Sequence, residues 1–169
     1  TLDTALQWQD PLSLTPAKLE EIYSAEGFSS SPFYAWSEDK KSARLARNPF
    51  SNITVDLTAF GGKLPVEEAI IRFEDGVARA IEIEIAGGEA EKATRELKAV
   101  LKDEPTRRMV SRPGLDSVSF ALWDRDSVRI TQAIGGARSV IRIVRKQDAH
   151  LACIHSPGDG TFAMICDLD

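Results

Sequence analysis

The sequence predicts an α+β fold: a mainly antiparallel sheet of hairpins with a C-terminal meander, packed with two helices. Three observations lead to this class. Short runs of alternating apolar and polar residues are separated by glycine-containing turns, which is typical of strands joined as hairpins. Two other segments carry apolar residues at helical spacing. The chain has 169 residues, 43% of them hydrophobic, which suits one domain with a sizeable core, so residues 1–169 are treated as a single domain.

The first helix is predicted from Pro16 to about Ala25. Thr15 is a good N-cap, and Pro16 then takes the first helical position, where its missing N–H costs nothing. Leu14 and Leu19 fall at the two positions of a hydrophobic staple. The expected apolar face of this helix consists of Leu19, Ile22 and Tyr23, and Gly27 is expected to end it.

The clearest hairpin joins residues 67–74 to residues 77–86. A two-residue turn would put the apolar sets of the two strands on different faces, because a one-residue slip moves every side chain to the other face. A loop of three residues, 74–76, unites the two sets, so we predict that loop. Arg79 is then the one misfit on the apolar face. The predicted pairs are Phe73–Val77 and Ala69–Ile81, and the shared face holds Ala69, Ile71, Phe73, Val77, Ile81, Ile83 and Ile85.

The second helix is predicted from Glu89 to Lys102. Its first turn is acidic and its last turn is basic, and both choices suit the helix dipole. The apolar face consists of Ala90, Ala93, Leu97, Val100 and Leu101. The arginine- and proline-rich residues 106–114 that follow are interpreted as a loop.

The C-terminal third is predicted to be a meander of strands. Close spacing of strand runs favours antiparallel neighbours over parallel units with crossover helices. An earlier run, 52–57, alternates as a half-buried strand and is followed by a turn at 61–63. No internal repeat is evident in the sequence. The five runs of the meander are 118–122, 128–134, 140–145, 149–155 and 161–168.

Composition and charge exclude some classes of partner. The formal net charge is −5, so the chain lacks the basic excess that drives non-specific nucleic-acid binding. No apolar run approaches the roughly 20 residues that a membrane-spanning helix needs. Either a removed leader or a trimmed start accounts for Thr1, and both interpretations stay open. We favour a periplasmic or extracellular location over a cytoplasmic one.

The two cysteines, Cys153 and Cys166, are expected to face each other in the last two strands. In an exported protein either a disulfide or two thiols fits this placement, whereas in a cytoplasmic protein two buried thiols are favoured. A nucleophile and base built from Cys153 with His150 or His155 is the catalytic alternative. Cys153 and His155 would lie roughly 7 Å apart along one strand face, which is too far for a direct hydrogen bond. Ligand spacing for a metal is absent, and we predict neither metal nor cofactor.

Glu82 and Glu84 share a strand face with Arg72 and Glu68 across the hairpin. A solvated charged sheet surface accounts for this set more simply than an acid pair for catalysis does.

Residues 33–47 hold the densest aromatic cluster of the chain, followed by basic residues. Aromatic and arginine side chains are enriched at binding hot spots, and irregular loops carry many binding residues. The predicted ligand-binding residues are Phe33, Tyr34, Trp36, Arg44 and Arg47.

We therefore predict a non-catalytic module, exported from the cytoplasm, that binds a protein or a small ligand. The alternative is a small hydrolase that uses Cys153 or a serine with His155. A third class is a sheet that encloses a small apolar ligand.

Overall fold

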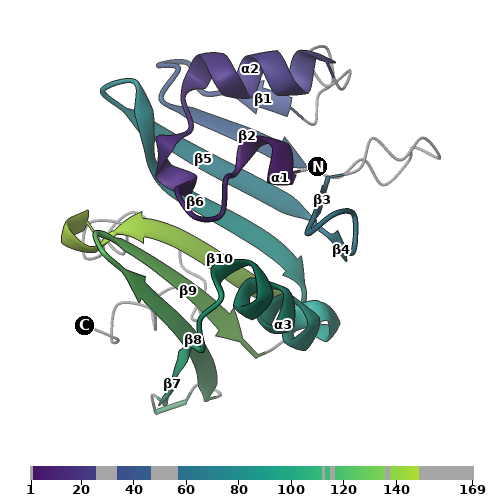
Figure 1. Ribbon diagram of the computed structural model, residues 1–169, viewed down its shortest axis with the longest axis vertical. Helices are drawn as coiled ribbons and strands as arrows, with labels where there is room; N and C mark the ends of the chain where they lie inside the picture. The colour runs from purple at the N-terminus through teal and green to yellow at the C-terminus, as the bar shows by residue number, and fades with distance from the viewer. Residues whose placement is uncertain are drawn as a thin grey trace.

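The computed structural model describes residues 2–25, 34–46, 57–111, 113–114, 117–135 and 138–148. One eight-stranded sheet dominates this part of the chain, with the strand order β1-β2-β5-β6-β10-β9-β8-β7 and every neighbouring pair antiparallel (Figure 1). The predicted α+β class is confirmed. The strands are β1 (Tyr34–Trp36), β2 (Ser42–Ala46), β5 (Glu68–Glu74), β6 (Val77–Ala86), β7 (Thr106–Val110), β8 (Val118–Arg125), β9 (Val128–Ile134) and β10 (Arg138–Arg145).

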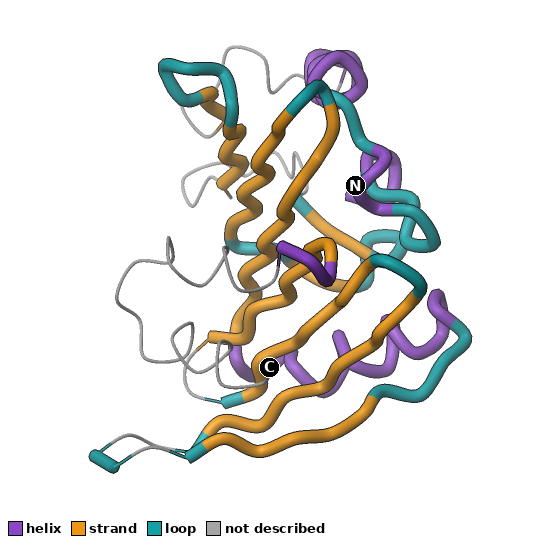
Figure 2. Tube along the Cα trace, turned by 90° about the vertical axis from the view of Figure 1, so that its left-hand side faces the viewer, coloured by secondary structure: helices purple, strands orange, loops and turns teal. Residues whose placement is uncertain are grey.

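Helices cover one face of this sheet. They are α1 (Leu2–Ala5), α2 (Pro16–Ala25) and α3 (Ala90–Leu101), and Figures 1 and 2 show them on the same side. The main core lies between them and the sheet, and every second residue of the central strands points into it. We call the opposite side of the sheet the second face. Core side chains include Leu19, Ile22, Leu97, Leu101, Ile71, Ile83 and Ile141.

Both predicted helices are confirmed. The backbone N–H of Lys18 donates to Oγ1 of Thr15 at 3.2 Å, which is the expected N-cap contact. Leu14 and Leu19 are buried, as the staple requires. The second predicted helix is α3, and Lys102 ends it in a left-handed conformation with φ of 54°.

The described part of the chain repeats one architecture. A helix followed by four antiparallel strands occurs twice, first as α2 with β1, β2, β5 and β6, and then as α3 with β7 to β10. The two units join where β6 pairs with β10. The first unit also carries a small hairpin of β3 (Thr58–Ala59) and β4 (Leu64–Pro65), and the turn between these strands was predicted.

The predicted three-residue loop between β5 and β6 is wrong. Glu74 pairs with Val77, so the loop has only two residues, Asp75 and Gly76. Both have positive φ, 54° and 80°, which suits the two-residue hairpin turns whose twist matches that of the strands.

A β-bulge restores the apolar face that the three-residue loop was meant to explain. Phe73 pairs with Ala78, and Arg72 pairs with Ala80, so Arg79 is an extra residue in β6. Beyond the bulge Ile71 pairs with Ile81, whereas the predicted register would have paired Ile71 with Arg79. The predicted apolar set is therefore buried on one face except for Val77: Ala69, Ile71, Phe73, Ile81, Ile83 and Ile85. The prediction is wrong for Val77, which pairs with Glu74 on the other face, while Ala78 pairs with Phe73 in the core.

The predicted loop over 106–114 is wrong in its first part, which forms β7. Among the described strands, β7 lies at the sheet edge and pairs with β8 alone. Four of its five residues are exposed, so its sequence lacks the apolar alternation that marks a half-buried strand.

The first three runs of the predicted meander are confirmed as β8, β9 and β10. The predicted strands at 149–155 and 161–168 lie outside the described residues, as does the predicted strand at 52–57 apart from its last residue, the buried Leu57. Within the described residues, no helix combines the length and apolar character that a bilayer crossing requires.

Candidate functional site

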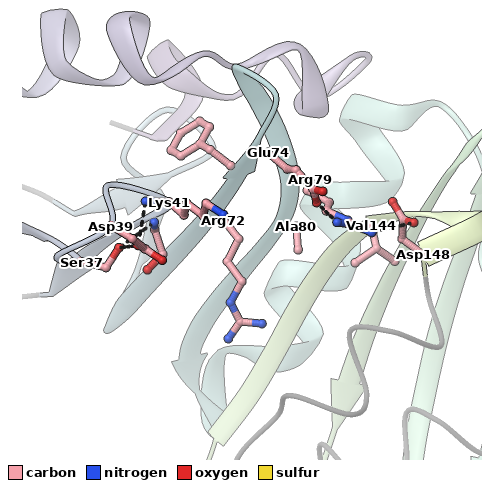
Figure 3. Close-up of a pocket in the computed structure, with 11 residues that line it drawn as sticks. Ser37, Asp39, Lys41, Arg72, Glu74, Arg79, Ala80, Val144 and Asp148 are labelled. Carbon is pink, nitrogen blue, oxygen red and sulfur yellow. Dashed lines mark hydrogen bonds and ion pairs between the residues drawn. The ribbon is translucent and has the colours of Figure 1, made fainter.

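A pocket of about 410 Å³ opens on the second face, near the turn that joins β5 to β6 (Figure 3). Four segments far apart in the sequence form it: the β1-β2 turn, β5, β6 and the residues at the end of β10. Its volume lies within the range of roughly 300 to 1,000 Å³ that small-molecule sites occupy. Three acidic and three basic side chains line it, namely Asp39, Glu74, Asp148, Lys41, Arg72 and Arg79.

The β-bulge brings Arg79 into this pocket. Because Arg79 and Ala80 both oppose Arg72, the extra residue takes Arg79 off the apolar face that sequence reasoning assigned to it. Its guanidinium then forms ion pairs with Glu74 and with Asp148, the latter at 3.3 Å between Nη2 and Oδ1. The misfit of Arg79 in the predicted register was therefore the sequence signal for the bulge and the pocket.

The β1-β2 turn supplies a fixed negative charge at the opposite side of the pocket. The Ser37 hydroxyl donates to Oδ1 of Asp39 at 2.6 Å, and the backbone N–H of Lys41 donates to the same oxygen at 3.1 Å. The hydrogen bond from Ser37, followed by that from Lys41, lowers the pKa of Asp39 below its ordinary value of 3.8. Asp39 thus stays ionised through the neutral range and is a weak base.

The Asp39 turn is expected to titrate in acid only. Because the folded pKa is depressed, the contribution of this carboxylate to stability is present above pH 3.8 and is lost as the pH falls through the lower folded pKa. NMR of the Asp39 carboxyl carbon should give a folded pKa below 3.8, and Ser37→Ala should move it back toward that value. An unchanged pKa in the Ser37→Ala protein would contradict the assigned cause.

A row of charged side chains continues from the pocket along the second face. Ala80 pairs with Val144 on the pocket floor, and Glu82 pairs with Arg142 one step further along the same two strands. Oε1 of Glu82 lies 3.8 Å from Nη1 of Arg72 and 3.3 Å from Nη2 of Arg142. In Figure 3 the side chain of Arg72 extends away from the Ser37–Asp39 turn.

This row corrects the prediction of a solvated charged surface. The side chain of Arg142 is 2% exposed and that of Glu82 is 13% exposed. Desolvation lowers the pKa of Arg142, opposed by the charge of Glu82. Among the described residues, no side-chain nitrogen of Arg142 makes a hydrogen bond.

Sequence reasoning missed Arg142 because it read residues 140–145 as a β-branched strand. A single charged residue between Ile141 and Ile143 was the available signal. Charged residues are almost never fully buried without a partner, so a lone arginine in an apolar strand indicates a special environment.

The structure separates the predicted binding residues. Phe33 and Arg47 lie outside the described residues, and Tyr34 belongs to β1, opposite Leu45. Trp36 is half-buried and stacks on Phe73, with 5.5 Å between ring centroids, and its indole N–H donates to Glu20. Trp36 thus packs against the core.

Arg44 lies on the second face. It is the residue after Ala43, which pairs with Trp36 and is buried in the core, so Arg44 and Trp36 point to opposite sides of the sheet. The exposed Arg44 guanidinium binds Glu68 through two hydrogen bonds of 3.0 and 3.1 Å. The structure therefore does not bring Trp36 and Arg44 together, and a ligand-binding role for the predicted residues stays a prediction.

Both cysteines and both histidines, Cys153, Cys166, His150 and His155, lie outside the described residues. The choice between a disulfide and two thiols, and the catalytic alternative, both concern residues that the structure does not describe. Within the described residues, no group of three or more potential metal ligands comes together.

Comparison with known proteins does not assign this chain to a family. Neither a protein-family model nor a curated protein matches the sequence. One solved structure, the crystal structure of a GTP binding regulator from Thermotoga maritima, is similar with a TM-score of 0.33 and 11% sequence identity, over 72% of this chain and 74% of that one. A likeness at this level carries no argument about function.

Proposed function

We propose that this chain is a non-catalytic binding module that takes a small polar ligand in the pocket on the second face. The observation that carries the proposal is a pocket of about 410 Å³ in which side chains from four distant segments converge. Ligand sites combine such a volume with a few convergent polar groups. A sheet that encloses an apolar ligand is less well supported, because charged side chains line this pocket.

The bonding within the pocket supports binding more than catalysis. The Ser37 hydroxyl is engaged by Asp39, and the low pKa of Asp39 makes it a poor acceptor for the proton of a nucleophile. Arg79 is held by two carboxylates. Such prearranged charges orient a ligand without reacting with it. The hydrolase alternative needs Cys153 or a serine with His155, and it stays a prediction, as does export from the cytoplasm.

Ligand screening by NMR tests the proposal. A library of amino acids, sugar acids, nucleotides and short peptides should contain compounds that shift the amide resonances of Lys41, Ala80 and Val144 in a saturable way. Ala80→Phe should abolish these shifts, because the new ring fills the pocket. Ala86→Phe is the matched control, because Ala86 lies on the same face of the same strand, is exposed, and lines no described part of the pocket.

The proposal fails if no compound in the library shifts the pocket resonances. It also fails if Ala80→Phe binds the selected compounds as tightly as the wild-type protein does. Equal loss of binding in the Ala80→Phe and Ala86→Phe proteins would place the ligand somewhere else on the second face.

A further inference from the structure

We propose that Arg72 and Arg142 form a subsite for an oxyanionic group, such as a phosphate or carboxylate, beside Glu82 and next to the pocket. This inference deepens the proposed function and rests on it, because the pocket provides the path for a ligand that carries the group. Two guanidinium groups converge there on a single carboxylate.

Strand pairing places the subsite one step from the pocket floor. Arg72, Ala80 and Val144 pair in one row across β5, β6 and β10, and all three line the pocket. The next row along the same face contains Glu82 and Arg142. Arg72 reaches diagonally from the first row to the second, so it belongs both to the pocket and to the charged cluster.

Arg142 has more hydrogen-bonding capacity than its surroundings use. A guanidinium carries five N–H donors in a planar fork that matches an oxyanion in two-point contact. The nearest oxygen of Glu82 lies 3.3 Å from Nη2 of Arg142, yet this oxygen accepts no hydrogen bond from the described residues. The fork of Arg142 is therefore left unused by Glu82.

The charge balance also favours an anion. Arg72 and Arg142 carry two positive charges against the one negative charge of Glu82, and the side chain of Arg142 is 2% exposed, so water screens it little. A buried charge without hydrogen bonds is costly. An oxyanion between the two guanidinium groups would supply both the missing acceptors and the missing negative charge.

Thermal unfolding with added inorganic phosphate tests the subsite, with chloride replaced by phosphate at constant ionic strength. The wild-type protein should be stabilised in a saturable way. Arg142→Met should abolish this stabilisation, and Arg72→Met should weaken phosphate binding about tenfold, as expected for a lost charged hydrogen bond. Arg138→Met is the matched control, because Arg138 lies on the same face of β10 and is 71% exposed.

Glu82→Gln gives a result that a merely structural role does not produce. Removing the negative charge of Glu82 should tighten phosphate binding several-fold, because that carboxylate lies 3.8 Å from Arg72 and 3.3 Å from Arg142 and repels an anion bound between them. If Arg142→Met fails to fold, Arg72→Met and Glu82→Gln carry the test. The subsite is disproved if neither phosphate nor acetate gives saturable stabilisation of the wild-type protein, or if Glu82→Gln and Arg72→Met both respond to the bound anion as the wild type does.

Acetate in place of phosphate shows which oxyanion the subsite prefers, and binding of either supports it. The two proposals fail separately. Compounds that bind the pocket equally well with and without Arg142 would leave the proposed function intact and overturn the subsite. If phosphate binding depends on Arg142 but no compound of the library binds the pocket, the subsite stands and the proposed function is overturned.

Discussion

Replacing Trp123 with alanine should lower the free energy of unfolding by about 3–5 kcal/mol. Trp123 lies in β8, is 1% exposed and belongs to the main core. Its indole Nε1 also donates to the carbonyl oxygen of Asp103 at 3.0 Å, just after α3 ends. The substitution removes a large buried ring and releases one of the contacts that hold the end of α3 to the sheet, where Arg125 also donates to the carbonyl of Leu101.

Urea unfolding followed by circular dichroism measures this effect. Trp123→Phe separates its two causes, because it keeps most of the buried ring and removes the hydrogen bond to the carbonyl of Asp103, an exposed residue, at a cost of roughly 0.5–1.5 kcal/mol. Met109→Ala is the control, because Met109 is a large apolar residue that is 69% exposed, and its loss should stay within about 0.5 kcal/mol. A similar loss for Trp123→Ala and Met109→Ala would contradict the structure at β8.

Elements whose signals are local could be predicted from the sequence. The helix α2 carries its own start in Thr15 and Pro16, and each of these acts within one turn of the helix. The helix α3 carries an apolar face that alone predicts its orientation. Where residues within a few positions of each other determine the conformation, a single sequence is sufficient.

Pairing between strands depends on more than the residues of one strand. The apolar pattern of β5 and β6 correctly required a shared face, but a bulge at Arg79 met that requirement in place of a longer loop. Both solutions satisfy the same pattern, and the twist of the turn decides between them. The repeated helix and four-strand unit was also missed, because it repeats a geometry and no evident sequence.

Which residues form the candidate site depends on the face of the sheet to which each side chain points. Trp36 and Arg44 are close in the sequence, but the pairing of Trp36 with the buried Ala43 puts them on opposite sides of the sheet. The pocket joins segments between Ser37 and Asp148, whose approach follows only from the full sheet order. Arg79 and Arg142 were both visible as charged residues in apolar runs, so charge within an apolar strand is the signal to follow.

The pairing of Glu82 with Arg142 gives the second large prediction. In phosphate-free buffer, Glu82→Leu should lower the free energy of unfolding by about 3–5 kcal/mol, because it leaves Arg142 buried without its counter-charge. Combining Glu82→Leu with Arg142→Met should recover most of that loss, because a buried ion pair and an apolar pair of similar volume are often equally stable. Urea unfolding of the single and double variants gives the coupling energy of the pair.

Glu84→Leu is the matched control on the same strand face, where the partner Arg138 is 71% exposed and the expected loss is only about 0–1 kcal/mol. If the double variant instead loses the sum of the two single losses, Glu82 does not neutralise Arg142, and the charge that an oxyanion would have to balance is larger than the described contacts indicate.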